Sequence, residues 1–173
     1  MQSLNFSSFS ELNTERLFLS FVTLADTASI FDLRTNKIIN EYITRHVPKD
    51  IAETKAFINK ISENTKKGKN LFWTIRLKEN NRIIGTIGYH SFSLDYKYAE
   101  VGYELDPSFH KKGLMGEALK KVLETGLNKL NFETIEAFTH KDNQSSKALL
   151  EKYNFVFQPS RVDIGFENNV IYQ

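Results

Sequence analysis

Residues 100–119 have a pattern that can bind an anion. A strand-like run ends in an Asp-Pro pair, a turn containing Gly113 and Gly116 follows, and an amphipathic helix begins within that turn. Glycine lets backbone N–H groups approach a ligand closely, and the first turn of a helix offers four unpaired N–H groups with a partial positive charge. Such a turn suits a pyrophosphate, to which Lys111 and Lys112 would add charge.

The glycine spacing excludes two common phosphate-binding motifs. No Lys-Ser or Lys-Thr pair follows Gly116, so the turn is not a P-loop, and the Gly-x-Gly-x-x-Gly spacing of a dinucleotide fingerprint is missing. A Gly-x-x-Gly turn taken alone is a weak signal, because the two glycines could serve only to shape a loop. Its meaning therefore depends on the elements around it.

Metal and thiol chemistry find little support in the sequence. The four histidines, His46, His90, His110 and His140, do not have a metal-ligand spacing such as His-Glu-x-x-His, and lone histidines are more often structural or exposed. The chain has no cysteine, which excludes disulfides, thiolate metal sites and a cysteine nucleophile. We expect no metal.

Hydrophobic periodicity predicts the elements that must position the turn. Strands are expected at Leu12–Phe21, Leu71–Leu77, Arg82–His90, Tyr98–Leu105 and Thr134–Thr139, with short closing strands at Phe155–Phe157 and Val170–Tyr172. Helices are expected at about 23–33, 50–67, 115–130 and 145–153. The Asn80-Asn81 turn favours a hairpin between the second and third strands. Strands that first meander and then alternate with helices indicate an α/β (α+β) fold.

Composition limits the remaining possibilities. The 173 residues are 40% hydrophobic and 25% charged, which suits one globular domain over residues 1–173. The net charge of +2 is spread along the chain, so we expect no nucleic-acid partner. No apolar run is long enough for a membrane span, and residues 1–10 do not resemble a signal peptide. We therefore expect a cytoplasmic protein without a membrane partner.

The stretch 100–119 resembles motif A of the GNAT acetyltransferases, in which a strand ends in Asp-Pro and a Gln/Arg-x-x-Gly-x-Gly/Ala turn follows. The turn here reads His110-Lys111-Lys112-Gly113-Leu114-Met115. His110 replaces Gln or Arg, and Met115 replaces Gly or Ala. Neither departure removes a backbone N–H group.

Three further segments fall where that family places them. Residues 12–19 are similar to the opening strand of the RimJ/RimL-like branch, and residues 99–103 to its central strand. Residues 143–155 are similar to motif B, with Asn154 in place of a glycine, and asparagine tolerates a left-handed conformation. The resemblance spans roughly residues 12–172. It implies a GNAT fold with a mixed, mostly antiparallel sheet of about six to seven strands, flanked by helices and split near its centre.

The resemblance also implies a set of residues that bind acetyl-CoA. The end of the central strand would pair its backbone with the pantetheine arm, the glycine turn would hold the pyrophosphate, and one asparagine would bond near the cofactor amides. These residues are Tyr103, Glu104, Leu105, Lys111, Lys112, Gly113, Leu114, Met115, Gly116 and Asn143. An alternative for Asn143 is a simple helix-start role.

Catalytic roles are carried over less directly. Many relatives place a tyrosine acid on the last helix, but the matching position here is Leu150, so Ser146 is the candidate to protonate the departing thiolate. A solvent-facing serine in the first turn of a helix is the alternative role for Ser146. Amine acetylation also needs a base. Glu100 and Glu104 share a strand face with Gly102. Glu100 is the better candidate, because two residues separate it from the cofactor edge; Glu136 is the reserve, and ion pairing is the alternative role for both.

The predicted activity is therefore acetyl transfer from acetyl-CoA to a primary amine by direct attack in a ternary complex. The RimJ/RimL-like resemblance implies a protein N-terminus as acceptor. A small amine such as a polyamine, amino acid or aminoglycoside is the alternative, as is a non-catalytic CoA-binding module. The segments 35–49 and 92–97 are expected to shape the acceptor site. We expect the protein to be a monomer or a homodimer.

Overall fold

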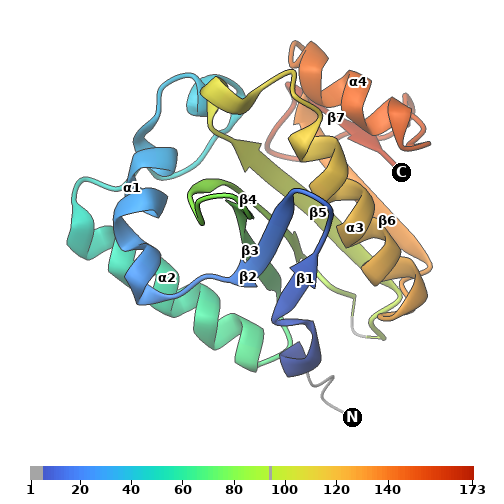
Figure 1. Cartoon of the computed structure of the whole chain (residues 1–173). Helices are drawn as coiled ribbons and strands as arrows, with labels where there is room; N and C mark the ends of the chain where they lie inside the picture. The colour runs from blue at the N-terminus through green and yellow to red at the C-terminus, as the bar shows by residue number, and fades with distance from the viewer. Residues whose placement is uncertain (1–5, 94) are drawn as a thin grey trace.

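The computed structural model describes residues 6–93 and 95–173 and contains a seven-stranded sheet in the order β1-β2-β3-β4-β5-β6-β7 (Figure 1). All neighbouring strands are antiparallel except β5 and β6, which are parallel. The strands are β1 (Glu11–Asn13), β2 (Leu17–Phe21), β3 (Leu71–Leu77), β4 (Ile83–His90), β5 (Tyr98–Leu105), β6 (Thr134–His140) and β7 (Asn169–Tyr172). The mixed, mostly antiparallel sheet predicted from the sequence is confirmed.

Among the described residues, four α-helices accompany the sheet: α1 (Thr27–Thr35), α2 (Ile51–Lys66), α3 (Leu114–Asn128) and α4 (Gln144–Lys152). Short 3-10 turns lie at η1 (Phe6–Phe9), η2 (Leu24–Asp26), η3 (Ile39–Tyr42) and η4 (Pro107–Phe109). In the described part of the chain, no helix combines the length and apolar character needed to cross a membrane.

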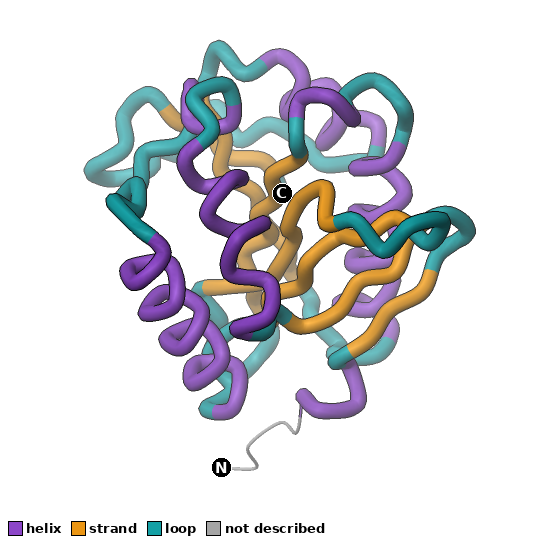
Figure 2. Tube along the Cα trace, turned by 60° about the vertical axis from the view of Figure 1, so that its left-hand side comes forward, coloured by secondary structure: helices purple, strands orange, loops and turns teal. Residues whose placement is uncertain are grey.

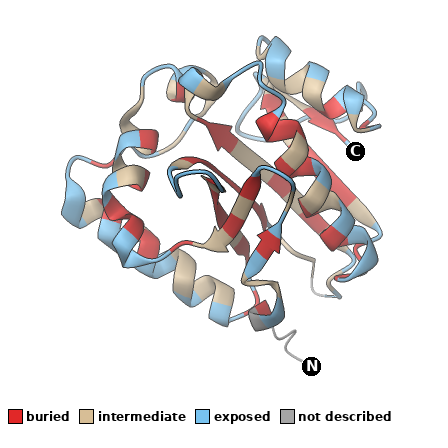
Figure 3. Cartoon of the chain, in the orientation of Figure 1, coloured by how far each residue is buried: buried red, intermediate tan, exposed pale blue. Residues whose placement is uncertain are grey.

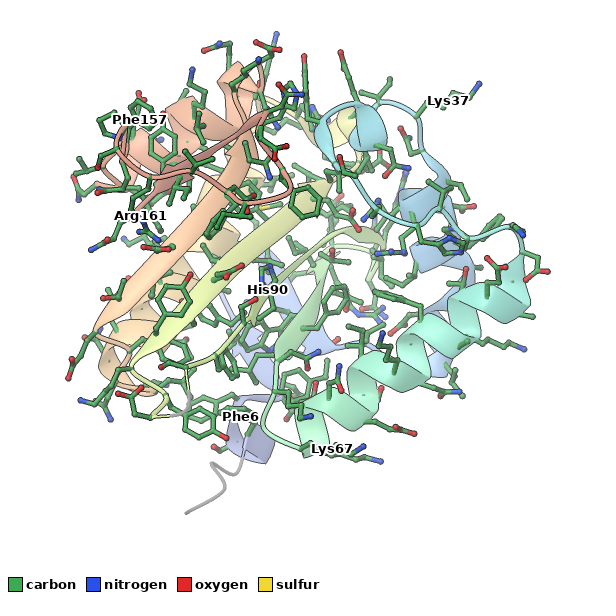
Figure 4. The ribbon with its side chains drawn as sticks, turned by 180° about the vertical axis from the view of Figure 1, so that it is seen from behind. Phe6, Lys37, Lys67, His90, Phe157 and Arg161 are labelled. Atoms are coloured by element: carbon green, nitrogen blue, oxygen red, sulfur yellow. The ribbon has the colours of Figure 1, made fainter. Side chains whose placement is uncertain are left out.

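The helices occupy both faces of the sheet. Apolar residues of α3, including Leu119 and Val122, pack with Trp73 and Tyr89 in the main core, while a smaller cluster beneath α1 and α2 contains Ile58. Figure 2 shows α1 and α2 side by side, and Figure 3 shows the buried residues concentrated along the strands. From behind, β5 and β6 lie in front with no helix over them, and α2 lies to one side (Figure 4).

Two strand predictions are wrong. Leu12–Phe21 is not one strand but a hairpin of β1 and β2, because Thr14 exchanges bonds with Leu17: its backbone N–H donates to the Leu17 carbonyl, and its hydroxyl oxygen accepts from the Leu17 N–H. Local side-chain bonds of this kind compete with an extended strand. Phe155–Phe157 makes only one isolated bridge, to Tyr172. The left-handed turn at Asn154 (φ 65°) and Pro159, which lacks an N–H, bound this segment.

The sheet opens between β5 and β6. Their parallel pairing has three steps, Tyr98 with Thr134, Ala99 with Ile135 and Glu100 with Glu136. Beyond these pairs β5 runs on to Leu105 without β6 beside it, while β6 stays paired to β7 from Ala137 to His140. Among the described strands, therefore, none pairs with the backbone of β5 on that side over residues 101–105. The predicted central split is confirmed.

Candidate active site

The turn before α3 presents a row of free backbone donors. Gly113 precedes the helix with φ 74°, a left-handed conformation that favours glycine, and Lys111 is also left-handed at φ 60°. The first hydrogen bond of the helix runs from the Glu117 N–H to the Gly113 carbonyl. Within residues 6–93 and 95–173, no acceptor bonds the six N–H groups of residues 111–116. The turn therefore has the geometry of an anion site.

The hairpin of β1 and β2 supports this turn. The Glu117 carboxylate accepts from the Thr14 hydroxyl at 2.5 Å, from the Arg16 backbone N–H at 2.8 Å and from Arg16 Nε at 2.7 Å. Burial opposes ionisation of Glu117, but these bonds outweigh it and hold its pKa below the usual value. Arg16 also donates to the Lys112 carbonyl at 3.0 Å.

Arg16 is a site residue that the sequence reasoning missed. A Cβ atom built on Gly113 would lie 3.5 Å from the guanidinium of Arg16, so this cation borders the free N–H groups. The signal in the sequence was an Arg within the segment that resembles the family's opening strand. Its meaning was hidden because Arg16 and Gly113 are 97 residues apart.

Three predicted residues meet beside the opening between β5 and β6. The side-chain oxygen of Asn143 accepts the Ser146 N–H at 3.1 Å and caps α4. The Ser146 hydroxyl lies 2.9 Å from that of Tyr103, which reaches α4 from β5. Burial raises the pKa of Tyr103 to about 12, although the Ser146 hydrogen bond acts in the opposite direction. The Tyr103 hydroxyl is therefore neutral at physiological pH, and either hydroxyl can be the donor in the bond between them.

The side chains of Glu104, Leu105 and Met115 have structural roles. Glu104 is buried, lies 2.5 Å from a guanidinium nitrogen of Arg45 and accepts from the Thr86 hydroxyl at 3.1 Å. Leu105 and Met115 are buried in the main core. These three side chains are therefore not free to contact a ligand. The Glu104 backbone faces β4, and the Leu105 carbonyl lies 2.9 Å from Nε2 of His110.

Glu100 stands where β5 and β6 separate. One carboxylate oxygen accepts from the Tyr98 hydroxyl at 3.2 Å, and the other lies 3.3 Å from Nδ1 of His90. Burial raises the pKa of Glu100, but His90, followed by Tyr98 and Ser91, lowers it more, so the net shift is downward. The carboxylate is therefore ionised at neutral pH.

Glu136, the reserve base, is fully engaged. Only 2% of it is exposed, two guanidinium nitrogens of Arg161 bond its carboxylate, and the Tyr98 hydroxyl donates to it at 3.0 Å. The Arg161 side chain comes from the segment after α4 (Figure 4). Over the described ranges no three metal-ligating side chains gather in one place.

A family model described as "Acetyltransferase (GNAT) domain" matches residues 16–156. The chain belongs to the GNAT acetyltransferase family. It is 29% identical over 147 residues to the uncharacterized N-acetyltransferase YoaA of Bacillus subtilis (strain 168), covering 85% of this chain and 83% of that protein. This GNAT protein is therefore an acyltransferase.

Two solved structures share the fold. RimL, a ribosomal L7/L12 alpha-N-protein acetyltransferase in complex with coenzyme A, superimposes with a TM-score of 0.80 at 19% identity, over 92% of this chain and 93% of that one. The ribosomal-protein-S5-alanine acetyltransferase of Vibrio fischeri gives a TM-score of 0.79 at 18% identity, over 94% of each chain. The RimJ/RimL-like resemblance thus extends to the three-dimensional fold.

Proposed function

We propose that this GNAT protein transfers an acetyl group from acetyl-CoA to a primary amine, with a protein N-terminus as acceptor. The observation that carries the proposal is the set of free N–H groups at residues 111–116, placed at the end of the strand that borders the opening in the sheet. These two features together fit a ligand that has a polyanionic pyrophosphate at one end and an extended chain that lies along the strand.

Each group of residues has a part in binding. The N–H groups of the turn hold the pyrophosphate, with charge added by Lys111, Lys112 and Arg16. On the side of β5 away from β4, the backbone of Tyr103 and the N–H of Leu105 pair with the pantetheine amides, while the Leu105 carbonyl already lies 2.9 Å from Nε2 of His110. The side-chain nitrogen of Asn143 is the donor that remains after its oxygen has capped α4. The bound thioester supplies the activated acetyl group.

Direct attack by the amine accounts for the chemistry with the residues present. The chain has no cysteine to form a thioester intermediate of its own. The open face of β5 and β6, where Glu100 lies, admits the amine from the side opposite α3. A backbone N–H near Tyr103 stabilises the oxyanion that forms on the carbonyl oxygen.

Binding is tested by thermal unfolding with CoA. A ligand at 100 times its Kd stabilises the folded state by about 2.7 kcal/mol. For a chain of this size we expect the Tm to rise by roughly 5–10 °C. The same concentration of adenosine, which lacks the pyrophosphate, is the control. An unchanged Tm at millimolar CoA would contradict the whole assignment.

Activity is tested with acetyl-CoA and a panel of amines. The panel contains a ribosomal-protein peptide with a free N-terminus, its N-acetylated copy and a polyamine. Because the chain has no cysteine, a thiol reagent reports released CoA alone. Turnover on the free peptide alone would support a protein N-terminus as the acceptor. Turnover on the polyamine only supports the small-amine alternative, and saturable CoA binding without turnover supports a non-catalytic module.

Ser146→Ala tests the proton donor to the leaving thiolate. If Ser146 supplies that proton, turnover should fall about 10²-fold while the Kd for CoA changes little. Ser145→Ala is the matched control, because Ser145 lies in the same helical turn and is exposed. Steady-state kinetics and a CoA titration measure both effects. Equal turnover in the two variants would remove Ser146 from the mechanism.

A further inference from the structure

His90 is the last residue of β4 and lies opposite Glu100 in the register of β4 and β5. Both side chains are on the open face of the sheet, where Figure 4 shows His90 near the middle. The imidazole is half exposed, with 54% of its side chain accessible, so a substrate can reach it. Its position beside the point where β5 and β6 separate puts it next to the proposed reacting centre.

The two ring nitrogens of His90 have different surroundings. Nδ1 lies 3.3 Å from the Glu100 carboxylate and 3.3 Å from the Ser91 hydroxyl. Nε2 lies over Gly102 and would be 3.1 Å from a Cβ at that position. Nε2 makes no hydrogen bond with the described residues. A proton on Nδ1, facing the carboxylate, leaves the lone pair of Nε2 free above the strand.

The neighbouring charges determine which group can hold a further proton. Glu100 is the charged group beside His90, and the Tyr98 hydroxyl lies within hydrogen-bond distance of both Glu100 and Glu136, which share its single proton. The Glu136 charge is balanced by Arg161. The pKa of Glu100 lies below its usual range, so this carboxylate is a weak proton acceptor at neutral pH. A histidine ordinarily changes charge between pH 5 and 8.

We propose that Nε2 of His90 takes the proton from the acceptor ammonium, directly or through one water, and that Glu100 positions the ring and stabilises the imidazolium. Glu100 is then a positioning residue rather than the proton acceptor. This inference rests on the proposed function.

The step balances in protons and bonds. The ammonium gives one proton to Nε2, and the freed lone pair forms the N–C bond to the thioester carbon. The C–S bond breaks, and the Ser146 hydroxyl gives its proton to the thiolate. The second proton lost by the amide nitrogen passes through water and restores the Ser146 hydroxyl. His90 returns its proton to solvent. The net products are the amide, free CoA and one proton.

Kinetics of two variants separate the proposed roles. His90→Gln should lower kcat/KM about 10²-fold and remove the acidic limb of its pH profile. Glu100→Gln should lower kcat/KM only about tenfold, because the ring keeps its acceptor nitrogen and loses only the anion that positions it and stabilises the imidazolium. The Kd for CoA should stay unchanged in both. Glu63→Gln is the control, because Glu63 is exposed on α2 and pairs only with Lys67 one turn further along the helix.

Chemical rescue distinguishes a catalytic role of His90 from a purely structural one. Imidazole added to His90→Ala should restore turnover in proportion to its concentration, because the missing ring leaves an accessible space. Imidazole should not restore Glu100→Ala. A folded, CoA-binding His90→Gln protein with wild-type turnover, or one that keeps the acidic limb, would overturn the proposal.

Failure of the proposed function can be told apart from failure of the pair. If the wild-type protein acetylates no amine in the panel, the proposed function is wrong. NMR of the His90 ring then tests the pairing of His90 with Glu100 separately. We expect the neutral ring to carry its proton on Nδ1, facing the Glu100 carboxylate. A proton on Nε2 overturns the pairing by itself.

Discussion

Gly113→Val should weaken CoA binding roughly 5- to 150-fold. Gly113 has φ 74°, and a β-branched residue in that region costs on the order of 1–3 kcal/mol of strain. The turn can relieve this strain by changing its backbone, which moves the N–H groups of residues 111–116 away from the pyrophosphate. Binding must then restore the strained turn. Isothermal titration with CoA measures the loss.

Gly165→Val is the matched control for this experiment. Gly165 also has positive φ, at 86°, and a Cβ there would meet no atom within 4 Å. Its strain should lower the Tm without changing the Kd for CoA. Gly113→Asn should bind CoA better than Gly113→Val, since asparagine tolerates the left-handed region. Lys112→Ala should have a smaller, salt-dependent effect. Wild-type affinity in Gly113→Val would show that this turn does not hold the pyrophosphate.

Glu104→Ala should destabilise the fold by about 3–5 kcal/mol. The side chains of Glu104 and Arg45 are 5% and 14% exposed and form an ion pair that joins β5 to the segment between η3 and α2. Removal of one partner leaves the other charge buried and unpaired. One Arg45 nitrogen is already buried without a hydrogen bond in the described residues, so no spare acceptor is at hand. Urea unfolding measures the change in the free energy of unfolding.

An exposed ion pair is the control for the buried one. Lys97 and Glu133 pair with 51% and 65% of their side chains exposed, so Glu133→Ala should cause no measurable loss. A double variant, Glu104→Leu with Arg45→Met, should recover much of the stability, because it leaves no unpaired charge in the interior. Equal, small effects of Glu104→Ala and Glu133→Ala would contradict this account.

The elements themselves could be predicted because their signals are local. The helical spacing of apolar residues after Pro107 predicted α3, the Asn80-Asn81 turn predicted the β3–β4 hairpin, and Asn81 is indeed left-handed at φ 59°. The failures were also local in origin. Thr14 closes a turn through its own side chain, and hydrophobic alternation carries no signal for such a turn.

The sequence by itself determined the family, the mixed sheet and the position of the glycine turn, because each depends on residues near one another in the chain. The partners of the site residues were decided only by the tertiary structure. Arg16 reaches the turn of Gly113 through a hairpin that the sequence reading missed, and Tyr103 meets Ser146 only because β5 and α4 flank the same opening.

His90 illustrates the difference most directly. As a lone histidine it gave no signal for chemistry, and Glu100 alone was the candidate base. The antiparallel register of β4 and β5 sets the two side by side, and Gly102 leaves room above the strand. Register depends on the packing of a whole face rather than on any one residue. The sequence therefore specified which groups are present, and the fold decided which of them can exchange a proton.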